Sequence, residues 1–238
     1  MIPLDSLFII DLETVSQSPD FSTLAADWQQ LWAQKIDKQL PPEEDAASFY
    51  PKRAAILAEF GKIICISAGY FRMNGLQPVL RVKSYAGHDE KEVLQQFMHD
   101  AGLWQARKKT AAFAGHNIRE FDIPYLCRRL LINQIPIPPW LDFQAMKPWE
   151  TNLVDTMQMW RFGDFKNYTS LNLLAACLQV PSPKDDIDGS MVGEAYWQHN
   201  ELERIAAYCQ KDVVTVAQVL LRFRGMPLLA AQHIELVK

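Results

Sequence analysis

Residues 7–13, which read LFIIDLE, decide the fold class of this 238-residue chain. Apolar and β-branched residues dominate the stretch, which is typical of a buried strand. Asp11 and Glu13 nevertheless place two carboxylates within it. Residues two apart on a strand project from the same face of the sheet, so both acids point the same way. We expect the strand to end at this pair, at the rim of a sheet.

The rest of the chain alternates between strand patterns and helix patterns. Apolar residues at helical spacing predict a helix over residues 21–39, followed by a proline-rich polar loop. Asn74-Gly75 is a hairpin turn signal between two predicted strands. The predicted elements are strands at 62–71, 79–85, 110–114 and 153–156, a helix that Asp89 caps and that runs through Trp104, and helices at 122–131, 170–178 and 200–223. This alternation predicts an α/β domain with a mixed central β-sheet flanked by helices.

Composition and charge limit the classes of partner. Apolar residues make up 49% of the chain and charged residues 22%, as in an ordinary globular protein. The formal net charge of -4 argues against a broad basic surface for duplex binding, so any contact with nucleic acid must be local. Candidate patches are Lys52-Arg53, Arg107-Lys108-Lys109 and Arg128-Arg129, although short basic runs are more often solvated helix faces.

The cysteines and the hydropathy pattern bear on the compartment. The four cysteines stand singly without C-x-x-C spacing, which argues against a zinc knuckle and a disulfide framework. We expect Cys65, Cys127, Cys177 and Cys209 to be small buried side chains in a reducing compartment. No apolar run approaches the ~18 residues of a membrane span, and no signal-peptide pattern is visible. We therefore expect a cytoplasmic protein without membrane contact.

Acidic residues recur at two later places in the sequence. Asp122 directly precedes a predicted helix, where capping of the helix N-terminus is the ordinary explanation. Tyr208 and Asp212 are four residues apart on a predicted helix and share one face, as many pairs without a function do. Asp11 and Glu13 repel each other unless a cation lies between them, and Mg²⁺ or Mn²⁺ prefers such oxygen ligands. At this point the acidic residues have two possible explanations: they form a divalent-metal site, or they are unrelated surface acids.

The order of these motifs resembles the DEDD superfamily of 3′–5′ exonucleases. The motifs are FIIDLET at residues 8–14, the segment from GHN to FDIPYL at 115–126, and YCQKD at 208–212. With a tyrosine at position 208, the chain resembles the branch typified by the proofreading domain of family B DNA polymerases, and it also resembles small stand-alone bacterial exonucleases. The histidine branch would carry His at position 207, which is Ala207 here. The resemblance implies a ribonuclease H-like fold and one exonuclease domain, residues 1–238, with a helical insertion at about residues 16–60.

The resemblance also implies a chemistry for the acidic residues. It implies two divalent cations, Mg²⁺ or Mn²⁺, held by Asp11, Glu13, Asp122 and Asp212. In the family pattern Asp11 is shared, Glu13 and Asp212 hold the ion on the nucleophile side, and Asp122 supports the second ion, largely through water. Tyr208 would orient the attacking water, because a phenol with a pKa of about 10 is a poor base at neutral pH. The implied reaction is two-metal-ion hydrolysis at the 3′ end of single-stranded DNA, which releases nucleoside 5′-monophosphates.

Residues that bind the substrate are also implied by the resemblance. Asn117 and Phe121 resemble residues that hold or stack the terminal nucleotides. Phe121 fits equally well as a core residue, and Asn117 as a left-handed turn residue. Thr14 belongs to the first motif, and Lys184 lies in a polar loop that resembles a segment near the substrate. Asp155, at the end of another predicted strand, is either an outer-shell carboxylate or a helix cap.

Two other functions stay open on the sequence alone. One is a 3′–5′ exoribonuclease that uses the same site, because a contact to the 2′-hydroxyl is not visible in a sequence. The other is a non-catalytic nucleic-acid-binding module of the same fold. The presence of all four carboxylates and the tyrosine argues against the module, since a site without metal has no physical need for acids that repel one another. The resemblance favours DNA over RNA and leaves protein partners open.

Overall fold

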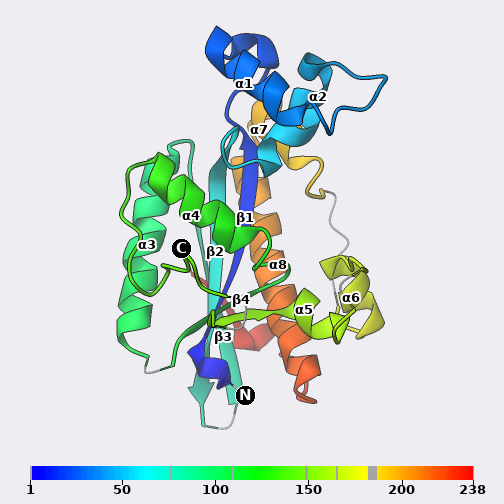
Figure 1. Cartoon of the computed structure of the whole chain (residues 1–238). Helices are drawn as coiled ribbons and strands as arrows, with labels where there is room; N and C mark the ends of the chain where they lie inside the picture. The colour runs from blue at the N-terminus through cyan, green and yellow to red at the C-terminus, as the bar shows by residue number, and fades with distance from the viewer. Residues whose placement is uncertain are drawn as a thin grey trace.

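One six-stranded mixed β-sheet forms the centre of the molecule (Figure 1). The computed structural model describes residues 2–75, 77–108, 110–147, 150–164, 166–181 and 187–237. The sheet order is β5-β4-β1-β2-β3-β6, with β1–β2 and β2–β3 antiparallel and the other neighbours parallel. The strands are β1 (Leu7–Ser16), β2 (Gly61–Asn74), β3 (Gln77–Ala86), β4 (Ala112–Gly115), β5 (Leu153–Asp155) and β6 (Ile234–Val237). The predicted α/β class with a mixed sheet is confirmed.

Helices cover both faces of this sheet (Figure 1). They are α1 (Ala26–Ile36), α2 (Ala46–Arg53), α3 (Glu90–Ala106), α4 (Asp122–Ile132), α5 (Thr156–Arg161), α6 (Leu171–Cys177), α7 (Val192–Trp197) and α8 (Leu202–Phe223). Helices α3 and α4 pack on one face, and the long helix α8 crosses the other. None of the described helices is both long and apolar enough to span a membrane.

Strand β1 divides the core through the alternation of its side chains. Phe8 and Ile10 pack against α3 and α4, whereas Leu7 and Ile9 pack against α8. Full burial of such a side chain contributes roughly 1.5–3 kcal/mol, and a slip of one residue would exchange the two faces. The register of β1 is therefore held from both sides, and the same alternation turns Asp11 toward α8.

The prediction that the first strand ends at the acidic pair is wrong. Strand β1 continues to Ser16, with a shift in its pairing to β2 between Glu13 and Thr14. Strand β4 is only four residues long and pairs with β1 at residues 7–9. Beyond that point β1 has a strand partner on one side only, among the residues that the structure describes. The acids therefore lie at an open edge in the middle of the strand.

The other long elements occur where the sequence predicts them, with shifted ends. The Asp89 side chain caps α3 by accepting hydrogen bonds from the backbone N–H groups of Lys91 and Glu92. The helix predicted over 21–39 is shorter, because the 3-10 turn η2 (Phe21–Thr23) precedes α1. The sequence patterns did not predict α2, α5, α7 or β6. Each of these has at most eight residues, which is too short for a clear period.

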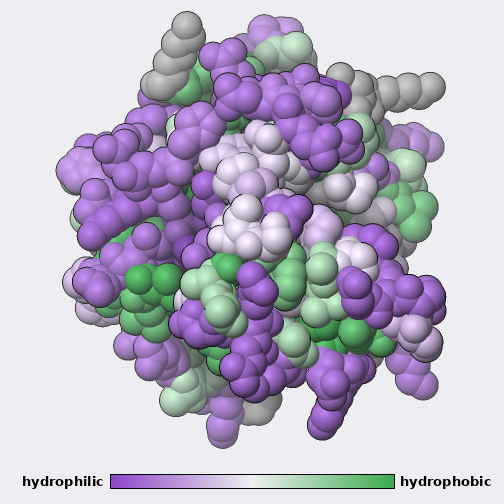
Figure 2. Space-filling model, turned by 90° about the horizontal axis from the view of Figure 1, so that it is seen from above, coloured by the Kyte–Doolittle hydropathy of each residue, from purple (hydrophilic) through white to green (hydrophobic). Residues whose placement is uncertain are grey.

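Residues 21–60 form a helical unit with its own small core, at the top of Figure 1. Trp32 is fully buried there, donates its indole N–H to the Ala46 carbonyl at 2.7 Å and contacts the rings of Tyr50 and Phe60. The 3-10 turn η3 (Ala54–Ile56) then leads the chain back alongside β1. Seen from above, this end of the molecule is mostly hydrophilic with small apolar areas (Figure 2).

One expectation about the cysteines is wrong, and one candidate basic patch does not form. Cys65 and Cys209 are buried as predicted, but Cys177 is exposed because it lies on the outer side of the short helix α6. The run Arg128-Arg129 is not a basic surface patch. Arg129 is only 5% exposed and pairs with the carboxylate of the equally buried Glu90. This ion pair joins α4 to the start of α3.

Candidate active site

Four carboxylates and a tyrosine line one cleft of about 750 Å³. Asp11 and Glu13 come from β1, Tyr208 and Asp212 come from α8, and Asp122 is the first residue of α4. The structure thus brings together the five residues that the sequence singles out as catalytic. Four of them lie between β1 and α8, while Asp122 comes from a helix on the opposite face of the sheet.

The open edge of β1 explains how Asp122 reaches the cleft. Its carboxylate accepts a hydrogen bond from the backbone N–H of Leu12, which lies beyond the last residue of β1 that pairs with β4. Phe121 holds the cap position of α4, so Asp122 begins the helix but is not its N-cap. A helix N-terminus favours a negative charge within its first turn. The helix start and the strand edge together stabilise a carboxylate at this place.

Burial and mutual repulsion make this group of acids costly without a cation. Burial, followed by the charges of Asp212 and Asp122, raises the pKa of Asp11 well above its usual value. Burial, followed by the charge of Asp11, does the same to the pKa of Glu13. Burial raises the pKa of Asp122 to about 7. Among the described residues, no Lys or Arg forms an ion pair with Asp11, Glu13 or Asp122.

The donor set fits a hard divalent cation. Oxygen atoms of Asp11 and Glu13 and the Sγ atom of Cys209 all lie within 4.8 Å of one another. The Cys209 thiol donates to the backbone carbonyl of Asp11 at 3.4 Å, and burial raises its pKa. A protonated thiol is a poor ligand for Mg²⁺ or Mn²⁺, so the carboxylates are the groups that could hold such a cation here. The sequence predicted that Cys209 is buried but did not indicate this position between α8 and β1.

Tyr208 lies one helical turn before Asp212 on α8. Burial, followed by the charges of Asp212 and Glu13, raises the pKa of the Tyr208 phenol above its usual range, and a hydrogen bond to the Asp212 carboxylate acts in the same direction. The phenol therefore keeps its proton at neutral pH. In this state it can orient a water molecule but cannot serve as a general base.

Three of the four residues that the resemblance associates with substrate also line the cleft. Asn117 has a φ of 62°, so it is a left-handed turn residue, and its buried Oδ1 has no hydrogen-bond partner among the described residues. Phe121 is half-buried and packs on the ring of Tyr125 at 5.3 Å. Thr14 forms a side-chain hydrogen bond with Tyr125. Lys184 lies outside the described residues.

Asp155 supports the cleft from behind and does not line it. Its carboxylate accepts hydrogen bonds from the backbone N–H groups of Asn117, Arg119 and Met157. It therefore caps α5 and also braces the turn that carries Asn117. His116 lines the cleft beside this turn, and its Nε2 lies 2.8 Å from the Thr169 carbonyl. Of the two explanations for Asp155, the structure shows the helix cap.

Two walls that the sequence did not assign flank the acids. One wall comes from the end of the helical unit, and the other from the segment at the start of α6. The first consists of Arg53, Ala55 and Ile56, and the second of Tyr168, Ser170, Leu171 and Asn172. Beyond them lie Asp188 and Gly189, which belong to the polar loop that the resemblance associates with substrate. The basic pair Lys52-Arg53 was the only local signal for the first wall. Nothing in the sequence around Tyr168 marked the second.

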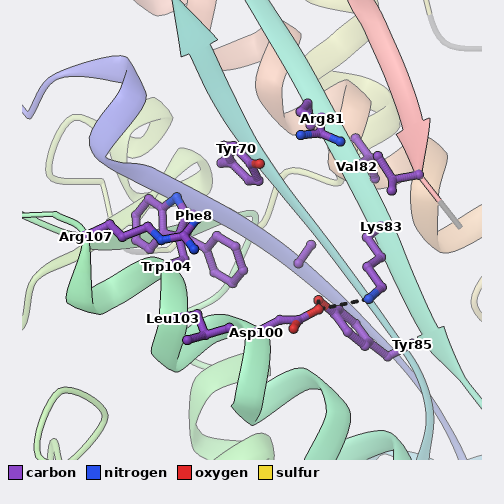
Figure 3. Close-up of a pocket in the computed structure, with 12 residues that line it drawn as sticks. Phe8, Tyr70, Arg81, Val82, Lys83, Tyr85, Asp100, Leu103, Trp104 and Arg107 are labelled. Carbon is purple, nitrogen blue, oxygen red and sulfur yellow. Dashed lines mark hydrogen bonds and ion pairs between the residues drawn. The ribbon is translucent and has the colours of Figure 1, made fainter.

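A second hollow, of about 210 Å³, lies between α3 and β3 on the other face of the sheet (Figure 3). Arg81, Lys83 and Arg107 border it together with aromatic rings. Lys83 pairs with Asp100 at 2.9 Å, and Arg81 pairs with Glu235 at 3.1 Å. Two of its three cations are thus already neutralised, and none of the motif carboxylates reaches it. The hollow is therefore separate from the acidic cleft.

Comparisons with known proteins agree with this geometry. A family model described as a predicted 3′-5′ exonuclease related to the exonuclease domain of PolB matches residues 56–231, which include Asp122, Tyr208 and Asp212. No curated protein matches the chain. The family B DNA polymerase from the hyperthermophilic archaeon Pyrobaculum calidifontis matches with a TM-score of 0.52 and 16% identity, over 90% of this chain and 24% of the polymerase. This likeness confirms the ribonuclease H-like fold, and the chain spans about a quarter of the polymerase's length.

Proposed function

Because this chain belongs to the family of predicted 3′-5′ exonucleases related to the exonuclease domain of PolB, we propose that it removes nucleotides from the 3′ end of single-stranded DNA. The reaction is hydrolysis by a two-metal-ion mechanism, and the products are nucleoside 5′-monophosphates. One observation carries the proposal. Buried carboxylates from two faces of the sheet converge on one cleft beside a protonated tyrosine, at an energetic cost that a bound cation would offset at neutral pH.

The chain's own residues divide the work as follows. Asp11, Glu13 and Asp212 would hold the cation on the side of the nucleophile, and Asp11 and Asp122 would hold the second, with Asp122 acting largely through water. When bound, Mg²⁺ or Mn²⁺ supplies a hydroxide-like nucleophile and stabilises the leaving 3′ oxygen. Tyr208 holds the attacking water in line with the scissile bond. A nearby cation favours the charged form of a carboxyl group, so metal binding lowers the raised pKa values of these acids.

The terminal nucleotide lies against Phe121 and Asn117 in this proposal. The Phe121 ring offers a face for base stacking, which is worth ~1–3 kcal/mol without sequence preference. The Asn117 Oδ1 is a buried acceptor without a partner in the part of the chain that the structure describes, and such a group costs ~1–3 kcal/mol until a donor binds it. A hydroxyl or amino group of the nucleotide can be that donor. Thr14 and Lys184 complete the proposed set of substrate contacts.

We also propose that residues 1–238 act as one exonuclease domain, with a helical insertion at about residues 16–60. The support is that the end of this insertion lines the same cleft as the acids. Arg53 and Ile56 line this cleft, which supports a role for the insertion in substrate binding.

The proposal is tested by following single strands labelled at the 3′ or the 5′ end, as DNA and RNA in parallel, with Mg²⁺, Mn²⁺ or EDTA. We expect shortening from the 3′ end of DNA that requires a divalent cation and is lost in Asp11→Asn and Asp212→Asn. Faster shortening of RNA than of DNA would identify RNA as the substrate in place of DNA. A folded protein that shortens neither strand with either metal would leave the nucleic-acid-binding module as the function.

A further inference from the structure

The helical insertion brings a cation to the acidic cleft. Arg53 is the last residue of α2 and lines the cleft together with Ala55 and Ile56 of η3. The family match begins at residue 56, so Arg53 lies outside the matched part of the chain. Its place in the cleft follows from the tertiary structure.

The cleft around Arg53 is strongly acidic. Arg53 is the one Lys or Arg among the described residues that line it. His116 adds no positive charge at neutral pH, because burial lowers its pKa. The carboxylates that line the cleft are Asp11, Glu13, Asp122, Asp188 and Asp212. A nucleic-acid strand carries several phosphates past these groups, and in the proposed mechanism cations on the carboxylates would hold only the phosphate being cleaved. The remaining phosphates need another cationic partner.

The guanidinium of Arg53 is available for such a contact. The side chain is exposed, and Arg53 forms no side-chain hydrogen bond or ion pair with any other residue that the structure describes. Its neighbour Lys52 differs on both counts. The Lys52 Nζ pairs with Glu44 at 2.9 Å, and Lys52 is absent from the described lining of the cleft.

Buried contacts fix the place of Arg53 relative to the acids. Tyr50, one turn earlier on α2, is fully buried and packs on Trp32 with ring centroids 5.1 Å apart. The Tyr125 hydroxyl of α4 donates to the carbonyl of Ala55 at 2.8 Å. Tyr125 lies three residues after Asp122 on the same helix. One rigid helix therefore joins a metal-side carboxylate to the segment that follows Arg53.

We infer that Arg53 binds a phosphate of the substrate strand on the 5′ side of the scissile phosphate. The inference rests on the proposed exonuclease function. It identifies a second binding contact for the strand, besides the carboxylates, and the insertion supplies this contact. A guanidinium presents planar donors that match phosphate oxygens, and its charge is permanent. A substrate that has only the scissile phosphate cannot use this contact. The cleft therefore favours single strands long enough to carry an upstream phosphate.

The experiment compares two substrates. Thymidine 5′-monophosphate p-nitrophenyl ester has only the scissile phosphodiester, and p-nitrophenolate leaves in place of the 3′ oxygen of an upstream nucleotide. A single-stranded oligothymidylate has upstream phosphates as well. The values of kcat and KM are measured for both with Mn²⁺ at several salt concentrations. Arg53→Ala is compared with Lys52→Ala, which removes the same charge from the same helix, and thermal unfolding verifies the fold of each variant.

We expect Arg53→Ala to raise KM for the oligothymidylate roughly tenfold, as for loss of one charged hydrogen bond, with kcat unchanged. Hydrolysis of the ester should stay the same. The slope of log(kcat/KM) against log salt concentration should become shallower by about 0.7 for the oligothymidylate. Arg53→Lys should restore part of the loss, and Lys52→Ala should change KM by less than about twofold.

Three results would overturn the role of Arg53: equal effects of Arg53→Ala and Lys52→Ala, equal losses with the ester and the oligothymidylate, or an unchanged salt slope. If the wild type cleaves neither substrate, both the exonuclease proposal and this inference are overturned. Cleavage of both substrates by the wild type, with an oligothymidylate KM that Arg53→Ala leaves unchanged, would overturn this inference alone.

Discussion

Cys209 of α8 donates its thiol hydrogen to the backbone carbonyl of Asp11 on β1, with Sγ 3.4 Å from the oxygen. This contact sets how closely the helix approaches the strand at the acidic cleft. Tyr208 precedes Cys209, and Asp212 follows it within one turn, so the same approach places both proposed catalytic side chains of α8. A larger side chain at position 209 would separate the two halves of the site.

We therefore predict opposite outcomes for two substitutions of Cys209. Cys209→Leu overfills a buried site, which typically costs ~1–3 kcal/mol, and should lower the thermal unfolding temperature. It should also lower kcat by roughly 100-fold, because a displacement of about 1 Å in a reacting group has that effect. Cys209→Ala should keep about a third or more of the wild-type kcat. Unfolding curves and single-strand cleavage check both variants, and a fully active Cys209→Leu would contradict the packing argument.

The raised pKa values predict that the metal-free protein loses stability as the pH rises. Asp11, Glu13 and Asp122 bind protons more tightly in the folded state than in the unfolded chain, so their cost is absent below about pH 4, the unfolded pKa. The cost grows with pH while the group is ionised in the unfolded chain but still protonated in the folded state, and it levels off at the folded pKa, about 7 for Asp122. In EDTA, the unfolding temperature should fall from pH 5.5 to pH 8.5, and it should fall less in Asp11→Asn. Equal pH dependence of the two proteins would refute the repulsion.

Divalent cations should stabilise the folded protein through the same carboxylates. A ligand at 100 times its Kd adds about 2.7 kcal/mol, which corresponds to a rise of roughly 5–10 °C in the unfolding temperature of a protein of this size. The rise with Mn²⁺ should vanish in Asp11→Asn. Asp100→Asn serves as the control, because Asp100 lies at the hollow on the other face of the sheet and should leave the rise intact. A rise that survives Asp11→Asn would place the cation elsewhere.

Tyr208→Phe tests the positioning of the attacking water. The variant keeps the ring and removes the hydroxyl, so kcat should fall roughly 100-fold while KM for a single strand stays within about threefold. The pH dependence of the remaining activity should match that of the wild type between pH 6 and 9, because the raised pKa keeps the phenol protonated throughout this range. Loss of an alkaline limb from the profile in Tyr208→Phe would show that the phenol titrates during the reaction.

Local periodicity accounts for much of the fold and for the pairing of site residues. The alternation in residues 7–13 placed Asp11 and Glu13 on one face, and the four-residue interval in α8 placed Tyr208 beside Asp212. These relations depend on backbone geometry within a single element, so a sequence pattern is enough to predict them. The long helices and the hairpin followed from the same kind of local signal.

The tertiary structure decided how these pieces meet. The short strand β4 leaves an edge of β1 open, and through this edge Asp122 reaches acids from the other face of the sheet. The return of the insertion along β1 turned one residue of an ordinary basic pair, Arg53, into part of the cleft wall. Such relations join residues distant in sequence and depend on strand lengths and packing directions. The sequence by itself determined which residues are candidates for the site and which share a face, whereas the opening of an edge and the walls of a cleft arise only when separate elements pack together.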